Sequence, residues 1–152
     1  MQDKITQLTL LQKVETDCTC FNLRKASRVV TQLFDRVLHP SGLLVNQFTL
    51  LSAISLAGSI AIARLAQELV MDRTTLTRNL KPLERRGLIK IEPGLDRRMR
   101  IVSLTAEGQA TLAKALPLWE IAQARAIENL GQERWRTLLS HLSDAVYLLR
   151  DG

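Results

Sequence analysis

Residues 94–100 read GLDRRMR and place a glycine, an aspartate and three arginines between two runs of alternating apolar and polar side chains. The runs LIKIE and RMRIVSLT repeat every two residues, so they predict a β-hairpin with the basic segment at its tip. An arginine on such a tip can enter the minor groove of duplex DNA, where the negative potential is strongest. Asp96, Arg97, Arg98 and Arg100 are therefore candidate DNA-binding residues, and the Asp96 carboxylate is expected to orient the Arg98 guanidinium. The alternative interpretation is an ordinary polar turn.

The segment before the hairpin, RTTLTRNLKPLERRG, predicts a helix whose N-terminus is capped by Asp72. Leucines recur on one side of this helix and are expected to face inward, while the other side suits the major groove of DNA. The candidate groove-facing residues are Arg73, Thr74, Thr75, Thr77, Arg78 and Lys81. Arginine can donate two hydrogen bonds to guanine, so Arg78 is the candidate base reader. Arg73, Thr75 and Lys81 are expected to position the helix on phosphates.

The elements around these residues predict a mainly α fold with a small β-hairpin wing. Apolar residues at three- and four-residue spacing predict a helix over 20–38, then a second helix capped by Asn46 and ended by Gly58. A short helix in IAIARLAQEL, the turn VMD and the helix after Asp72 form a helix-turn-helix unit, which the hairpin extends to a winged helix. Thr105 is expected to cap a long helix with Gly108 in its first turn, and a last helix follows over 132–150.

We expect one domain over 1–152, with the winged helix-turn-helix at about 46–104 and dimerisation helices at about 18–40 and 105–150. The flanking helices carry apolar faces too wide for one small chain to cover, so a homodimer is expected.

The charge distribution favours a nucleic-acid partner. Residues 61–104 hold ten Lys and Arg against five Asp and Glu, an excess of +5 out of the net +6 of the chain. Aromatic residues make up only 4% of the chain, too few for single-strand stacking platforms, so the expected partner is double-stranded DNA. No membrane-spanning run, secretory signal, catalytic motif or cofactor motif is present in the sequence. A cytoplasmic protein that is not an enzyme, with no cofactor and no metal, is therefore expected.

Two cysteines, Cys18 and Cys20, lie at the start of the first expected helix. A helix N-terminus and the nearby Arg24 and Lys25 favour a reactive thiolate, so oxidation sensing is one interpretation. Cysteines two residues apart do not share a helix face, however, and small half-buried side chains are the plainer interpretation. A metal site built from the cysteines of two subunits is the third.

The segment IARLAQELVMDRTTLTRNLKPLERRGLIKI, followed by DRRMRIVSLTAEG, resembles the MarR family of bacterial transcription regulators, and the resemblance extends from about Cys20 to Arg150. It implies a homodimer on a pseudo-palindromic operator, with one recognition helix in each half-site and wings in the adjacent minor grooves. It also implies that Asp96 and Arg98 form the wing pair, and that the regulator is a repressor released by a small anionic ligand or by thiol oxidation. A winged helix that coats DNA without sequence preference or binds a protein is the alternative function.

Overall fold

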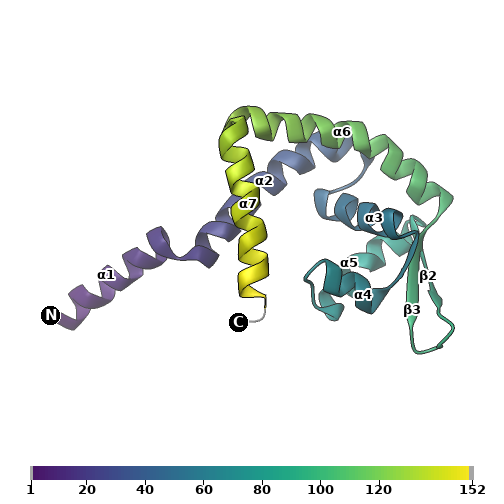
Figure 1. Ribbon diagram of the computed structural model, residues 1–152, viewed down its shortest axis with the longest axis horizontal. Helices are drawn as coiled ribbons and strands as arrows, with labels where there is room; N and C mark the ends of the chain where they lie inside the picture. The colour runs from purple at the N-terminus through teal and green to yellow at the C-terminus, as the bar shows by residue number, and fades with distance from the viewer. Residues whose placement is uncertain (1, 151–152) are drawn as a thin grey trace.

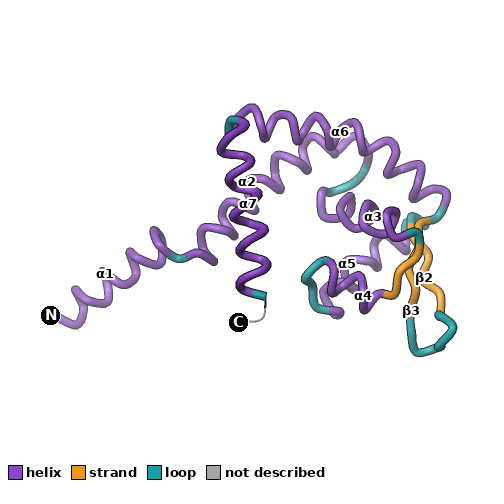
Figure 2. The backbone as a smooth tube through the Cα atoms, in the orientation of Figure 1, coloured by secondary structure: helices purple, strands orange, loops and turns teal. Residues whose placement is uncertain are grey.

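The computed structural model describes residues 2–150, and side chains from residue 4 onward. Figures 1 and 2 show a mainly helical chain with a small sheet, as the sequence predicted. The elements, in chain order, are α1 (Gln2–Asp17), α2 (Thr19–Leu38), the 3-10 turn η1 (His39–Ser41), α3 (Val45–Ala57), β1 (Ser59–Ala61), α4 (Ile62–Glu68), α5 (Arg73–Arg85), β2 (Ile89–Pro93), β3 (Arg100–Leu104), α6 (Ala106–Leu130) and α7 (Gln132–Leu149).

The helix-turn-helix and the wing lie where the sequence placed them. Helices α4 and α5 are joined by a short turn, and β2 and β3 form the antiparallel hairpin, with Ile91 opposite Val102 and Pro93 opposite Arg100. The sheet has a third strand that the alternation did not predict: β1 pairs with β3, with Ile60 opposite Val102, which gives the order β1-β3-β2. A three-residue strand is too short to show a periodicity, and it forms because β3 offers an open edge.

Two further features differ from the sequence-based expectations. Helix α1 was not predicted, because its aliphatic residues do not fall on one narrow face. Asn46 was expected to cap α3, and this was wrong: the cap residue is Leu44, and Asn46 lies in the first turn. The amide of Val45 instead donates to the Asp35 carboxylate at 2.7 Å, so a side chain from α2 satisfies the N-terminus of α3.

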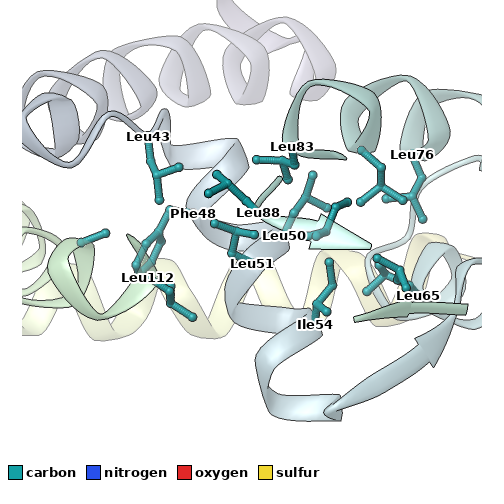
Figure 3. Close-up of a cluster of buried hydrophobic side chains, with 14 of the residues drawn as sticks. Leu43, Phe48, Leu50, Leu51, Ile54, Leu65, Leu76, Leu83, Leu88 and Leu112 are labelled. Carbon is teal, nitrogen blue, oxygen red and sulfur yellow. The ribbon is translucent and has the colours of Figure 1, made fainter. Parts of the chain in front are cut away.

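The hydrophobic core lies among α3, α4, α5 and the sheet and extends to α2 and α6 (Figure 3). Leu51 and Ile54 of α3 and Leu65 of α4 are fully buried, and the Phe48 ring stacks on Trp119 of α6 with centroids 6.2 Å apart. This core fixes the helix-turn-helix against the sheet, because burying each large aliphatic side chain contributes about 1.5–3 kcal/mol to folding.

The start of α6 is attached directly to the segment that joins α5 to β2. As predicted, Thr105 caps α6, and its Oγ1 accepts from the Gly108 amide at 3.0 Å. The same hydroxyl donates to the Gly87 carbonyl at 2.6 Å, and the Thr105 amide donates to the Leu88 carbonyl at 3.1 Å. The wing and the long helix α6 are therefore tied to the C-terminus of α5 at one point.

Over residues 2–150, no helix by itself has the length and hydropathy needed to cross a bilayer; only the bent pair Thr19–Ser41 and Val45–Ala57, at 71° to each other, meets that test when the two are taken together.

Candidate DNA-binding surface

Helix α5 divides cleanly into a buried side and an exposed side. Leu76, Leu80 and Leu83 have no exposed surface, as the leucine spacing predicted. The six residues proposed to face a major groove are all exposed: Arg73, Thr74, Thr75, Thr77, Arg78 and Lys81. Five of them, all except Thr75, line one shallow hollow of about 550 Å³. The helix therefore presents a continuous basic and hydroxyl surface.

The N-terminus of α5 is fixed by the predicted cap. The Asp72 carboxylate accepts from the Thr75 amide at 2.8 Å and from the Thr75 hydroxyl. These hydrogen bonds lower the pKa of Asp72 below its usual 3.8, and the bond from the Thr75 hydroxyl has the largest effect. The Thr75 hydroxyl is thus engaged within the helix, which distinguishes it from the other five exposed residues.

The turn between α4 and α5 holds a backbone conformation that is unusual for its residue. Val70 has φ 51°, in the left-handed region, although it is β-branched. Its amide donates to the Gln67 carbonyl at 3.2 Å, and the Met71 amide donates to the Ala66 carbonyl at 2.8 Å. These bonds close the end of α4 and turn the chain into α5, so they set the angle between the two helices.

The wing tip is closed by backbone hydrogen bonds and by one aspartate. The Gly94 amide donates to the Met99 carbonyl, and the Met99 amide donates to the Asp96 carbonyl, both at 2.8 Å. The Asp96 carboxylate accepts from the backbone amide of Arg98 at 3.0 Å. The expectation that Asp96 orients the Arg98 guanidinium is therefore corrected. A carboxylate two residues before an amide reaches that amide with little side-chain ordering, whereas an exposed ion pair must order a long arginine side chain.

Among the described residues, the basic side chains of α5 and of the wing tip have no carboxylate partner. Among the side chains described from residue 4 to residue 150, the two ion pairs are Arg64 with Glu68 and Lys90 with Glu92. Neither pair includes Arg97, Arg98 or Arg100 of the wing, nor the basic residues of α5, and all of these are exposed. Their charge is therefore available to a polyanion.

The wing and α5 belong to one unit. Strand β2 packs against α5, and β3 packs against α4. Figure 1 shows the hairpin beside these helices, with its tip extending beyond them. The candidate residues of α5 and of the wing are thus held on a common scaffold, although 15 positions separate Lys81 from Asp96 in the sequence.

The cysteines lie away from this surface, at the junction of α1 and α2 (Figure 1). Cys18 is the cap residue of α2, and its Sγ accepts from the Phe21 amide at 3.5 Å. Cys18 is half-buried, Cys20 is exposed, and both are free thiols. In the part of the chain that the structure describes, no three His, Cys, Asp or Glu residues gather as metal ligands would.

One feature escaped the sequence analysis because three separate segments build it. An apolar groove of about 470 Å³ lies between α2, the start of α3 and α7. Its lining residues are Leu23, Ala26, Ser27, Val30, Thr31, Phe34, Val45, Leu138 and Leu142. The only sequence signal for it was the wide apolar face of the flanking helices.

Comparisons with known proteins match this geometry. The family model described as MarR family matches residues 41–99, which contain the helix-turn-helix, β2 and the wing tip. The M. tuberculosis transcriptional regulator MosR, in a crystal structure with DNA, is 40% identical and superposes with a TM-score of 0.77 over 88% of this chain and 99% of MosR. This chain belongs to the MarR family.

Two further regulators are similar to this chain at lower identity. A MarR variant from E. coli complexed with operator DNA is 25% identical, with a TM-score of 0.78 over 87% of this chain and 96% of that chain. The transcriptional regulator HosA of Escherichia coli is 33% identical over 88 residues, which are 57% of this chain and 65% of HosA. The chain thus matches a little less than two thirds of HosA.

Proposed function

We propose that this MarR-family chain is a sequence-specific, double-stranded DNA-binding transcription regulator, and that it acts as a homodimeric repressor on a pseudo-palindromic operator. One observation carries the proposal: the exposed basic face of α5 and the unpaired wing arginines lie on the same rigid unit. Residues 46–104 are its DNA-binding part, and residues 18–40 and 105–150 supply the dimerisation helices. The protein works in the cytoplasm as a regulator and not as an enzyme.

The two parts of the surface have different tasks in this proposal. Helix α5 enters the major groove, where Arg78 reads a base and Thr74 and Thr77 contact base edges or phosphates. Arg73 and Lys81, the first and last of these exposed residues along α5, neutralise phosphates. Thr75 contributes mainly by holding the helix N-terminus together with Asp72.

The wing completes the footprint on DNA. Arg97, Arg98 and Arg100 approach the minor groove, whose negative potential attracts guanidinium groups. Asp96 shapes the turn by accepting from the Arg98 amide, so its carboxylate stabilises the loop that carries the arginines. This role replaces the direct Asp96–Arg98 pair that the family resemblance implied.

Dimerisation follows from the apolar surface that the flanking helices leave uncovered. Leu138, Leu142 and Val146 of α7 are 40%, 36% and 51% exposed, and Val30 of α2 is 46% exposed. Surfaces of this kind mark protein interfaces, and a two-fold dimer would present two α5 helices to the two half-sites of an operator.

The test is selection of bound sequences from a random duplex library with the purified protein in reducing buffer. We expect enrichment of an inverted repeat and specific binding at least about a thousandfold tighter than binding to random duplex. Arg78→Ala should weaken specific binding by about 1–3 kcal/mol and relax preference at one position of each half-site. Arg64→Ala is the matched control, because Arg64 is exposed but paired with Glu68. Selection without enrichment would support the alternative, a winged helix without sequence preference or one that binds a protein.

Release of the repressor by a small ligand or by oxidation is the second part of the proposal, and oxidation has candidate residues. The Cys18 thiol caps α2, and Cys20 is accessible to solvent. Cys18 is the cap residue and has an extended backbone, so the rule that cysteines two apart lie on different helix faces does not separate it from Cys20. Peroxide would oxidise one thiol to a sulfenic acid, and the other thiol would displace water to form a disulfide. Such a bond removes the Cys18 Sγ from its position near the Phe21 amide and disturbs the start of α2.

Operator binding before and after mild peroxide tests this trigger. Wild type should lose affinity and recover it with a thiol reductant, while Cys18→Ser and Cys20→Ser should keep their affinity. If both serine variants lose affinity as wild type does, the cysteines are not the switch.

A further inference from the structure

Helix α1 is exposed along its whole described length. Every residue from 4 to 17 is exposed, including Ile5, Leu8, Leu10, Leu11 and Val14, which are 50–59% exposed. Figure 1 shows the helix extending away from the rest of the molecule. A lone helix of this length is marginal in water, and clustered aliphatic side chains are unfavourable there. Covering α1 with a surface of another molecule would therefore be favourable.

The junction with α2 gives α1 a defined direction. The side-chain amide of Asn22 donates to three carbonyls at the end of α1 and at the cap: Glu15 at 3.5 Å, Thr16 at 3.2 Å and Cys18 at 3.0 Å. These acceptors are carbonyls that a helix end otherwise leaves without a partner. With Cys18 capping α2, hydrogen bonds at the end of α1 and at the start of α2 fix this junction, so α1 is held as a directed arm.

The charge of the arm argues against DNA and against an anionic membrane. Residues 1–17 contain two lysines, Lys4 and Lys13, and three acidic residues, Asp3, Glu15 and Asp17. Arms that bind phosphates carry an excess of Lys and Arg, because their affinity comes from neutralising charge. The partner of this arm is therefore an apolar protein surface.

We propose that α1 docks on a second copy of this chain, in the apolar groove between α2 and α7 of that copy. The inference rests on the homodimer of the proposed function and adds a part to it. The uncovered aliphatic residues of α1 continue directly into those of α2, Leu23, Val29 and Val30, and α2 itself forms one wall of the groove. The groove is lined mainly by apolar side chains and is open to the surface.

Symmetry makes the contact reciprocal. In a two-fold dimer each arm reaches the other subunit, so both arms and both grooves are covered by the same contact. The arm then covers the part of the α2 and α7 surface that lines the groove, including Leu138 and Leu142, whereas Val146 of α7 lies outside the groove.

The first test is the dimer dissociation constant of the full-length protein, measured by sedimentation. The double variant Leu8→Glu/Leu11→Glu should raise this constant at least tenfold. The control Gln7→Glu/Gln12→Glu places the same two charges at polar positions of the same arm and should leave the constant near that of wild type. Equal dissociation constants for the two variants would overturn the proposal.

The second test is photocross-linking with p-benzoylphenylalanine in place of Leu8, in dimers mixed from ¹⁴N- and ¹⁵N-labelled protein. We expect cross-links from the arm of one isotopic copy to peptides of α2 or α7 of the other copy. Cross-links confined to one copy, or none at all, would overturn the proposal. A wild type that is monomeric at all concentrations would instead refute the homodimer of the proposed function, so the two failures are distinguishable.

Discussion

Gly108, in the first turn of α6, lies against the backbone of Leu88, and a substitution at Gly108 tests this contact. A Cβ atom at this position would lie 1.9 Å from the Leu88 carbonyl oxygen and 2.9 Å from the Leu88 carbonyl carbon. Carbon and oxygen atoms in contact are normally about 3.3 Å apart, so Gly108→Ala must open this gap by about 1.4 Å. The obstacle is backbone, which cannot rotate aside as a side chain can.

The cost follows from what lies on either side of the gap. Moving α6 away strains the hydrogen bond from the Thr105 amide to the Leu88 carbonyl and loosens Leu88 and Leu112, which are 3% and 7% exposed. Overpacking costs about 1–3 kcal/mol and a lost hydrogen bond about 1 kcal/mol, while alanine regains up to about 1 kcal/mol of helix propensity. We expect a net loss near 3 kcal/mol, because the clash is with a fixed oxygen.

The assay is urea unfolding followed by circular dichroism, at one protein concentration so that dimerisation contributes equally to every variant. The free energy of unfolding falls by about 2 kcal/mol per M of urea, so the urea concentration at the unfolding midpoint should fall by about 1.5 M in Gly108→Ala. Gln109→Ala, at an exposed position in the same helical turn, is the control and should change the midpoint little. A Gly108→Ala protein within about 0.5 kcal/mol of wild type would refute the tight contact between α6 and the α5–β2 segment.

Three more outcomes are expected. Val70→Asn should raise the free energy of unfolding by up to about 1 kcal/mol in the same urea assay, because asparagine tolerates the left-handed backbone at φ 51° better than a β-branched residue; a loss of stability would contradict the strain. The lowered pKa of Asp72 means that its ionised form stabilises the fold above pH 3.8 and that this contribution disappears as the pH falls through the folded pKa. Asp72→Asn, which still accepts from the Thr75 amide, should therefore show a weaker dependence of its thermal midpoint on pH as the pH is lowered from neutral through the folded pKa of Asp72. An unchanged dependence would remove Asp72 from the acid response. Leu142→Glu should shift the protein from dimer to monomer in sedimentation, and a persistent dimer would count against α7 as interface.

The helix-turn-helix and the wing could be predicted from the sequence because short-range interactions determine them. The leucines of α5, the Asp72 cap, the two-residue period of the wing and the Thr105 cap each act over a few residues, so the type and spacing of the side chains determine them. The same reasoning identified the exposed basic face of α5 and the basic wing tip. Their roles at DNA remain predictions that the Arg78→Ala experiment tests.

Other features depend on contacts between distant segments, and only the tertiary structure decided them. The Asp35 carboxylate replaces Asn46 as the partner of the α3 N-terminus because folding brings α2 beside α3. Strand β1 exists because β3 offers it an edge, and Gly108 is required because the Leu88 carbonyl lies against it. The Asp96 carboxylate accepts a hydrogen bond from the Arg98 backbone amide, whereas the sequence pattern suggested a pair with the Arg98 guanidinium. The short-range hydrogen bond is favoured because it orders fewer side-chain torsions than an exposed ion pair does. Sequence by itself thus determined α5, the wing, their local caps and the charge of the binding surface, because these are local properties. The partner of the α3 N-terminus on α2, the edge strand β1 and the approach of Leu88 to Gly108 required the packed chain, because they join distant segments.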